Sequence, residues 1–264
     1  MRDIDAVVLA GSPPGSDSGA GDKLPNRAMT DIAGRPMLHW TVDALTNAST
    51  LSRIVAVGDV KADGLDTVVE PGDTLVENIK RGIDALEGGG ERVLLVSADI
   101  PMVTSAAIDD FVERATALQV DFAYPIVRRE VCESSYPQMK RTYLKTAQGT
   151  FTGGNVTMVT KSFVRDNWDM VSGAYDARKQ VTRLARIIGV GLLARVIVAQ
   201  ALPWVLNIAS LEDAASRVLQ ASVAAVISDF PELAEDVDKE SDMQTANAIL
   251  LARGKTLAGE MEVL

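Results

Sequence analysis

The chain is poor in the residues that build disulfide frameworks, thiolate metal sites and multi-histidine centres. Its 264 residues include one cysteine, Cys132, and one histidine, His39. A single cysteine excludes an internal disulfide and a zinc site made of several thiolates. A single histidine excludes a centre with several imidazole ligands, and any Ser-His nucleophile would depend on His39.

The chain also lacks a positive net charge and an uninterrupted apolar run of membrane length. There are 26 Lys and Arg against 36 Asp and Glu, a formal net charge of −10. This balance argues against a nucleic-acid partner, which would need a cationic face. Residues 187–209 are the most apolar stretch, but Arg195 and Pro203 interrupt the roughly 20 residues of a membrane span. We expect no integral membrane segment there but a buried helix; the alternative is a peripheral surface for a lipid or for a second subunit of a homodimer.

Composition and the N-terminus indicate a folded protein of the cytoplasm. Hydrophobic residues make up 47% and charged residues 23%, too apolar for a disordered chain. Asp3 and Asp5 interrupt what would be the apolar core of a signal peptide. With no internal repeat and no long linker, residues 1–264 are expected to form a single domain.

Short apolar runs alternate with amphipathic stretches through the first half of the chain. Strands are predicted at residues 6–9, 54–57, 67–69, 92–96 and 122–127, and helices at 36–48, 75–86 and 105–118. This alternation predicts an α/β fold: a Rossmann-like, mostly parallel sheet flanked by helices. Residues 160–220 are helical in character, and we interpret them as an insertion. A last strand at 222–227 and a final helix at 243–252 follow.

Three segments that could carry chemistry follow predicted strands. They are the loop after Leu9, Asp99, and the triplet Gly153-Gly154-Asn155. Ligands of open α/β sheets bind beyond the carboxyl ends of the strands, so these segments should meet. The loop after Leu9 matches neither the Walker A sequence nor the dinucleotide fingerprint, and a plain connector is the alternative for it.

Four segments spread over nearly the whole chain together resemble the signature of nucleotidyltransferases. Leu9-Ala10-Gly11, the glycine-rich loop after it and residues 27–38 are similar to L-A-G-G, a loop and K-A-L-x-x-x-x-G-K-P-M-L. Residues 98–101 resemble the A-D-x-P element, residues 152–155 the acceptor-side strand, and residues 236–242 the D-x-D/N-T-P-E-D element. This family includes molybdenum cofactor guanylyltransferases, cytidylyltransferases and sugar-nucleotide pyrophosphorylases.

The resemblance implies transfer of a nucleoside monophosphate from a nucleoside triphosphate to a small phosphorylated or hydroxylated acceptor. It assigns Asp99 as the main ligand of Mg²⁺, Asp238 as a second ligand, and Arg27 as the group that stabilises the leaving pyrophosphate. A phosphate acceptor is already a nucleophile and needs no general base. The resemblance implies nucleotide contacts at Leu9, Ala10, Gly11, Ser12, Thr74 and Asn78, and acceptor contacts at Gly153, Gly154 and Asn155.

Two positions depart from the family pattern. Ser12 stands where a second glycine is usual, and Arg27 replaces a lysine. Arginine holds phosphate bidentately but is not interchangeable with lysine. A catalytically degenerate nucleotide-binding or regulatory protein is therefore an alternative, and residues 187–209 motivate a transferase that acts on a lipid-linked acceptor. Residues 128–145 are locally basic, and we interpret them either as a solvated hairpin or as a site for an anionic acceptor.

The assigned residues also have purely structural explanations. Asp99 would cap the turn after its strand, and Asp236 with Asp238 would form a solvated acidic turn. Glu77 would close a capping box that begins at Thr74.

Overall fold

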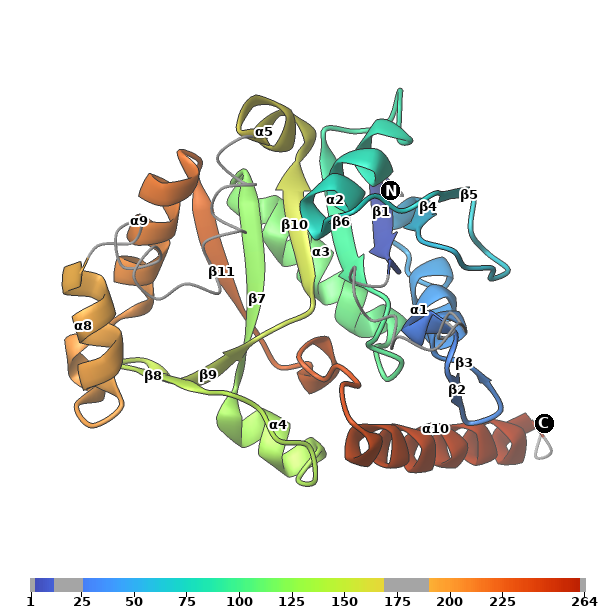
Figure 1. Cartoon of the computed structure of the whole chain (residues 1–264). Helices are drawn as coiled ribbons and strands as arrows, with labels where there is room; N and C mark the ends of the chain where they lie inside the picture. Colours follow the sequence, from blue (N-terminus) through green and yellow to red (C-terminus); the bar gives the residue numbers. More distant parts are fainter. Residues whose placement is uncertain (1–2, 12–25, 169–189, 262–264) are drawn as a thin grey trace, which may run out of the picture.

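The computed structural model describes residues 3–11, 26–168 and 190–261, and its central feature is a nine-stranded sheet (Figure 1). Its strands are β1 (Ile4–Leu9), β4 (Leu51–Val57), β5 (Thr67–Val69), β6 (Arg92–Ser97), β7 (Phe122–Arg128), β8 (Leu144–Thr146), β9 (Gly149–Gly153), β10 (Val156–Thr160) and β11 (Val223–Ser228). A separate ribbon pairs β2 (Asp31–Ile32) with β3 (Arg35–Pro36). Only β9 and β10 of these nine strands run against the rest, so the described sheet is mostly parallel, as predicted.

The extended chain between Gly149 and Thr160 is divided into β9 and β10 after Gly153. On one side of β7, β10 pairs with its first residues and β9 with its last. Only β10 also pairs with β6. The sheet therefore opens at the split, between the end of β6 and the end of β9, and Asn155 lies at this opening.

Helices cover both faces of the sheet, since β1 presents apolar side chains on both of its faces. Ala6 and Val8 pack into a core with α1 (Met37–Thr46) and α3 (Ser105–Leu118). Val7, between them, faces the opposite core, with α2 (Leu75–Asp84) and α5 (Lys161–Asp166). On that second side α9 (Ile208–Leu219) lies against β11.

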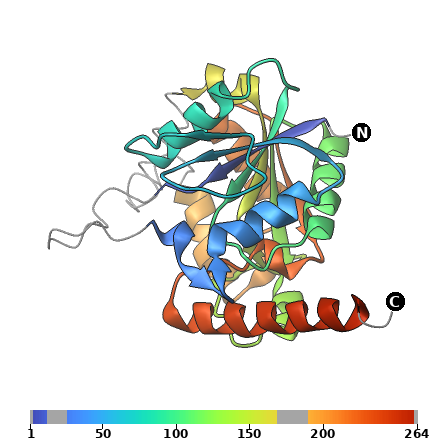
Figure 2. The same cartoon turned by 90° about the vertical axis from the view of Figure 1, so that its right-hand side faces the viewer.

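The remaining helices lie at the ends of the sheet. They are α4 (Arg129–Ser135), α8 (Val190–Ala199), α10 (Glu240–Met261) and the 3-10 turns η1 (Arg27–Met29), η2 (Pro203–Val205) and η3 (Pro231–Leu233). Figures 1 and 2 show α10 running along the end of the molecule beyond the carboxyl ends of the strands. Ala246 and Leu250 bury it against Ile32 and Met37. It begins before and ends after the predicted residues 243–252.

Threonine side chains cap α2, as predicted, and α3. Thr74 accepts a hydrogen bond from the backbone N–H of Glu77 at 3.1 Å, and Thr104 one from Ala107 at 3.2 Å. The Glu77 carboxylate accepts from the N–H of Asp73 rather than from that of Thr74. Pro36 is the cap residue of α1, whose first helical residue is Met37.

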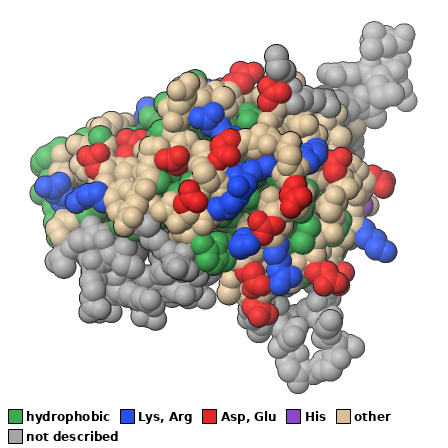
Figure 3. Space-filling view, turned by 90° about the horizontal axis from the view of Figure 1, so that it is seen from above, with side chains coloured by type: hydrophobic (Ala, Val, Ile, Leu, Met, Phe, Trp, Pro, Cys, Tyr) green, Lys and Arg blue, Asp and Glu red, His purple; other side chains and the backbone are tan. Residues whose placement is uncertain are grey.

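Two expectations need correction. Residues 128–145 are not a hairpin, because α4 occupies their first half. The described part of residues 187–209 is helical but not buried: Ile197 and Val198 on α8 are 65% and 43% exposed. Even so, the described part of the chain contains no helix that is both long and apolar enough to cross a membrane. On the face seen in Figure 3, acidic and basic side chains are interspersed.

Candidate functional site

Backbone hydrogen bonds bring the predicted segments together at the opening of the sheet. The carbonyl of Leu9 accepts from the N–H of Ala98 at 3.3 Å, which ties the end of β1 to the end of β6. The carbonyl of Asn155 accepts from Ser97 at 2.9 Å, and the N–H of Asn155 donates to Leu233 at 2.7 Å. The three loops expected to converge therefore do so, and η3 joins them.

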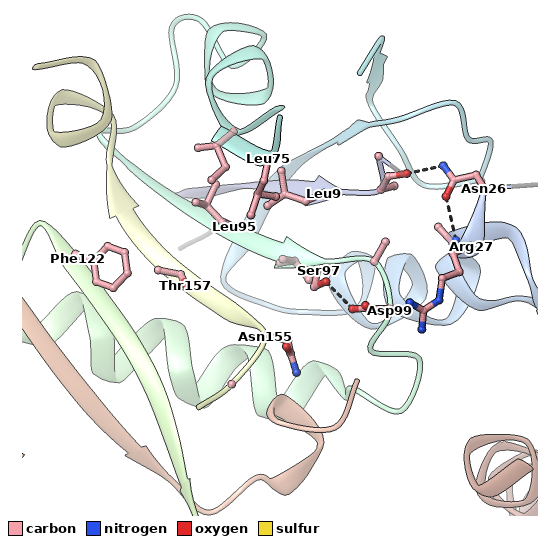
Figure 4. A pocket seen from close by; sticks show the side chains of 17 residues that line it. Leu9, Asn26, Arg27, Leu75, Leu95, Ser97, Asp99, Phe122, Asn155 and Thr157 are labelled. Atoms are coloured by element: carbon pink, nitrogen blue, oxygen red, sulfur yellow. Dashed lines mark hydrogen bonds between the residues drawn. The ribbon is translucent and has the colours of Figure 1, made fainter. Parts of the chain in front are cut away.

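A cavity of about 460 Å³ lies at this junction (Figure 4). Figure 4 shows Arg27 at one end and Phe122 at the other, with Asp99 and Asn155 between them. The predicted site residues that line it are Leu9, Ala10, Gly11, Arg27, Asp99, Gly154 and Asn155. Leu75, Ile79 and Leu95 give one wall an apolar surface.

Asn26 positions the arginine at the mouth of this cavity. Its amide N–H donates to the carbonyl of Ala10 at 2.5 Å, and its side-chain oxygen caps η1 through the N–H of Ala28. Arg27 is thereby held beside the end of β1. Its Nη2 donates to the carbonyl of Val237 at 2.5 Å and to Asp238 Oδ1 at 3.1 Å. With 56% of its side chain exposed, the guanidinium remains open to a ligand.

Asp99 is held from two sides. Its Oδ1 accepts a hydrogen bond from Ser97 Oγ at 2.5 Å, and its carbonyl accepts from the N–H of Val237 at 2.9 Å. Burial raises the pKa of Asp99, and the nearby charge of Asp238 raises it further, against the lowering effect of Ser97 and Arg27. A nearby cation stabilises the charged form of a partly buried carboxylate of this kind.

Asp236 is the third carboxylate of the cluster. It accepts hydrogen bonds from Arg141 Nη1 and, at 3.3 Å, from the amide of Asn155. Burial raises the pKa of Asp236; Arg141 counteracts this, while Asp99 and Asp238 add to it. Arg141 also binds Glu235 Oε2 at 2.8 Å, which anchors the loop that carries the cluster.

These carboxylates fit a divalent cation with a preference for oxygen. One oxygen each of Asp99, Asp236 and Asp238 lies within 4.8 Å of the others. The negative charge of Asp238 contributes to the raised pKa of Asp99, although Arg27, which is bonded to Asp238, acts in the opposite direction. Three hard oxygen donors with open space beside them suit Mg²⁺, which retains several waters in protein sites.

Several predicted residues lie outside the cavity. Thr74 is exposed and caps α2. Asn78 is buried behind the cavity wall, where it accepts from the N–H of Gly72 at 2.6 Å. A Cβ at Gly11 would lie 2.6 Å from the amide nitrogen of Asn78, so the glycine allows this packing. Ser12 lies outside the described residues.

The two glycines at the split of the sheet make room for neighbouring side chains. A Cβ at Gly153 would collide with the Tyr124 hydroxyl. At Gly154 a Cβ would lie 2.8 Å from Pro125 and 3.0 Å from the carbonyl of Leu233. Gly153 lines a second cavity, described below.

The structure adds three residues that the sequence argument did not single out for the site. Ser97 orients Asp99 through its hydroxyl. Its position at the end of the strand, two residues before Asp99, could have indicated this contact. Arg141 lay within the basic stretch, but nothing in the sequence paired it with Asp236. No sequence pattern marked Asn26 as the link to Ala10.

The model of the MobA-like NTP transferase domain matches residues 6–179. The chain belongs to this family. The described part of that range carries the cavity lining from Leu9 to Thr157, whereas Asp236 and Asp238 lie beyond it.

Relatives of this MobA-like domain support the assignment. A hypothetical transferase from Thermus thermophilus has 32% identity and a TM-score of 0.77, over 91% of this chain and 99% of that one. A 2-C-methyl-D-erythritol 4-phosphate cytidylyltransferase from Prochlorococcus marinus is 32% identical over 122 residues, or 42% of this chain and 52% of the relative. The chain thus matches about half the length of that curated relative. The 2-C-methyl-D-erythritol 4-phosphate cytidylyltransferase of Thermus thermophilus shares the fold, with a TM-score of 0.54 and 15% identity over 94% of this chain and 98% of that one.

Proposed function

We propose that the protein is a nucleotidyltransferase that moves a nucleoside monophosphate from a nucleoside triphosphate to a small phosphorylated or hydroxylated acceptor. One observation carries the proposal: Arg27, Asp99 and Asn155 line one cavity at the carboxyl edge of the sheet, and Asp236 and Asp238 each bring a carboxylate oxygen within 4.8 Å of one of Asp99. An acceptor oxygen attacks the α-phosphorus, a new P–O bond forms, and the α–β bridging P–O bond breaks. Pyrophosphate takes the electron pair of that bond and leaves.

Arg27, Asn155 and Ser97 have separate roles in this reaction. Arg27 contacts the departing pyrophosphate with its exposed guanidinium, and its bond to Val237 keeps it at the mouth of the cavity. The Asn155 amide, which already donates to Asp236, lies where an acceptor oxygen would approach. Ser97 holds the Asp99 carboxylate in one orientation. No side chain needs to act as a general base if the acceptor is a phosphate.

Asp99, Asp236 and Asp238 would hold Mg²⁺. When bound there, the ion neutralises the triphosphate and the charge that develops during transfer. The chain's own contribution is to place three carboxylates from two loops around one point, with Asp99 and Asp236 partly shielded from water and Asp238 exposed.

The apolar wall formed by Leu75, Ile79 and Leu95 suits the face of a nucleobase and the ribose. The curated relative and one structural neighbour are cytidylyltransferases, so CTP is the first nucleotide to test. We expect the activity in the cytoplasm, where nucleoside triphosphates are supplied.

Binding and turnover test the proposal separately. Thermal shift with ATP, CTP, GTP and UTP, with and without Mg²⁺, should show one stabilising nucleotide, since a ligand that binds the native state raises the melting temperature. Pyrophosphate release should then require that nucleotide, Mg²⁺ and an acceptor, and EDTA should abolish it. Binding without release across sugar, polyol, alkyl and aryl phosphates would instead favour the degenerate, regulatory alternative. Stabilisation by none of the four nucleotides contradicts both.

A further inference from the structure

A second cavity, of about 300 Å³, lies on the other side of Phe122 from the site just described. Phe122, Tyr124 and Ile126 of β7 form its floor, with Phe151 of β9 beside them and Leu211 and Ala215 of α9 as a wall. Its volume is at the lower end of the range for small-molecule sites, about 300–1,000 Å³.

The floor of this cavity is an apolar strand face that the described helices leave partly open. Along β7, Ala123, Pro125 and Val127 are buried against one side of the sheet. Phe122, Tyr124 and Ile126 point to the other side and stay only partly covered. The same side is packed by α2 over β1. Apolar surface left open in this way gains free energy when a ligand removes it from water.

The two cavities adjoin at the split of the sheet. Phe122 lines both of them. Gly153 belongs to the second cavity, and the next two residues, Gly154 and Asn155, line the first. Because Gly153 has no side chain, the Tyr124 hydroxyl lies directly against this backbone, at the passage from one cavity to the other.

The chemistry of the lining selects against an anion. Glu212 is the only charged residue among the described residues that line the second cavity. Its Oε1 is occupied by the N–H of Ala225 at 2.8 Å. A phosphate placed there would meet no cation and one carboxylate. The aromatic and aliphatic lining fits an uncharged apolar group.

We propose that the second cavity binds an apolar body of the acceptor, while the acceptor's phosphate or hydroxyl end passes Gly153 and reaches the amide of Asn155. The acceptor class is therefore a phosphate monoester or alcohol with a branched aliphatic or aromatic group, rather than a polar sugar phosphate. This inference rests on the proposed nucleotidyltransferase function. The reaction is unchanged: the acceptor oxygen bonds to the α-phosphorus and pyrophosphate leaves, and an alcohol acceptor also releases its hydroxyl proton to solvent. The hydroxyl of Tyr124 lies against Gly153, where the two cavities adjoin, and there it donates a hydrogen bond to the acceptor.

A series of acceptors tests the proposal with the full chain. Glycerol 1-phosphate, butyl phosphate, hexyl phosphate and phenethyl phosphate are each titrated by calorimetry and then assayed for pyrophosphate release with the stabilising nucleotide and Mg²⁺. Burial of each added methylene should raise affinity and kcat/KM about three- to fourfold until the cavity is full. Phenethyl phosphate should exceed glycerol 1-phosphate by at least about tenfold.

Two identical substitutions on α9 locate the effect. Ala215→Phe places a ring in the cavity, whereas Ala209→Phe places the same ring on the exposed side of the same helix. The preference for phenethyl phosphate over glycerol 1-phosphate should fall about tenfold or more in Ala215→Phe and stay at the wild-type value in Ala209→Phe. Melting temperatures show whether both variants fold, and Ala215→Leu replaces Ala215→Phe if the larger residue prevents folding.

The outcomes separate this inference from the proposed function. If turnover occurs with polar acceptors, and neither the length of the apolar group nor Ala215→Phe matters, the second cavity is not an acceptor site and the transferase proposal stands. If phenethyl phosphate binds and Ala215→Phe removes binding, yet no acceptor releases pyrophosphate, the cavity is a ligand site and the transferase proposal fails. Equal binding to both phenylalanine variants, or binding of none of the four phosphates, overturns the inference.

Discussion

The backbone carbonyl of Asp99 accepts a hydrogen bond from the backbone N–H of Val237 at 2.9 Å. This bond joins the end of β6 to the loop that carries Asp236 and Asp238. The relative positions of the three carboxylates are therefore set by the main chain, and a substitution of one carboxylate leaves the scaffold of the site in place.

The first prediction concerns Asp99→Asn, which removes the charge and keeps the shape. Pyrophosphate release should fall on the order of 100-fold or more, since a metal ligand contributes several kcal/mol to stabilisation of the developing charge. The melting temperature should be unchanged or higher, because burial and Asp238 disfavour the charged form of Asp99. Asp84→Asn is the control, since Asp84 pairs with Lys80 on the surface of α2. Full activity of the Asp99→Asn variant would contradict the role of Asp99 as a metal ligand.

The second prediction concerns Arg27. Arg27→Ala should lower kcat/KM about 10- to 100-fold, as the pyrophosphate loses a charged partner. Arg27→Lys should retain part of this rate, because an ammonium keeps the charge but cannot bond Val237 and phosphate with one planar group. Steady-state assays of both variants measure the effect. A rate above wild type in Arg27→Lys would show that the arginine impairs transfer, as the degenerate alternative requires.

The elements that could be predicted from the sequence are those determined by residues close together in the chain. The run Ala6–Leu9 is apolar at every position, and a strand buried on both faces requires just that. Thr74 and Thr104 lie directly before amphipathic stretches, and both cap helices. Helix α4 was missed because seven residues rich in charge show no clear apolar stripe before the core is known. The exposure of α8 depends on what packs against it, and its own apolar sequence does not reveal this.

The position of a site residue could be predicted where its neighbours in the sequence indicate it. Asp99 follows an apolar strand and precedes Pro101, so its place at the sheet edge could be read locally. The partners of the carboxylates could not. Arg141 reaches Asp236 and Glu235 from a distant loop, and Asn26 turns back to Ala10 across residues 12–25. Such pairings arise only when the fold brings the segments together.

The third prediction tests the anchoring role of Arg141. Its guanidinium is bonded to both Glu235 and Asp236, and the Glu235 side chain is almost completely buried. Arg141→Met leaves those charges without a partner, so the free energy of unfolding should fall by about 3–5 kcal/mol. Arg129→Met, which breaks an exposed pair with Glu133, should cost less than about 1 kcal/mol. Urea denaturation compares the two; equal losses would contradict the anchoring role.

The fourth prediction is a pH dependence of stability at Asp121, where β7 begins. The hydroxyl and the N–H of Ser222 donate to the Asp121 carboxylate at 2.6 and 2.9 Å, and they lower its pKa. A lowered pKa means that the stabilisation is complete above the unfolded value, about 3.9, and is lost as the pH falls through the lower folded value. Asp121→Asn should therefore reduce stability by roughly 1–2 kcal/mol near neutral pH.

Denaturation of wild type and Asp121→Asn from about pH 7 down to about pH 3 checks this. The difference between the two proteins should shrink as the pH falls. Ser222→Ala, which removes one donor, should show the same trend with a smaller amplitude. A difference that is independent of pH would show that the carboxylate charge plays no part.

The fifth prediction uses the single cysteine as a reporter of packing beneath the acidic loop. Cys132 is buried on α4, and burial, followed by the charge of Glu235, raises its pKa to about 12. At about pH 8 the native thiol should react with Ellman's reagent far more slowly than the unfolded one, because little thiolate is present and the reagent has no access. Unfolding in guanidinium chloride should restore full reactivity. Arg141→Met should speed labelling of the native protein, because it loosens the loop that holds Glu235 against Cys132, whereas Arg129→Met should leave the rate at the wild-type value. Native labelling as fast as that of the unfolded chain would mean that α4 does not pack over the loop, and the support of the carboxylate cluster would then need another source.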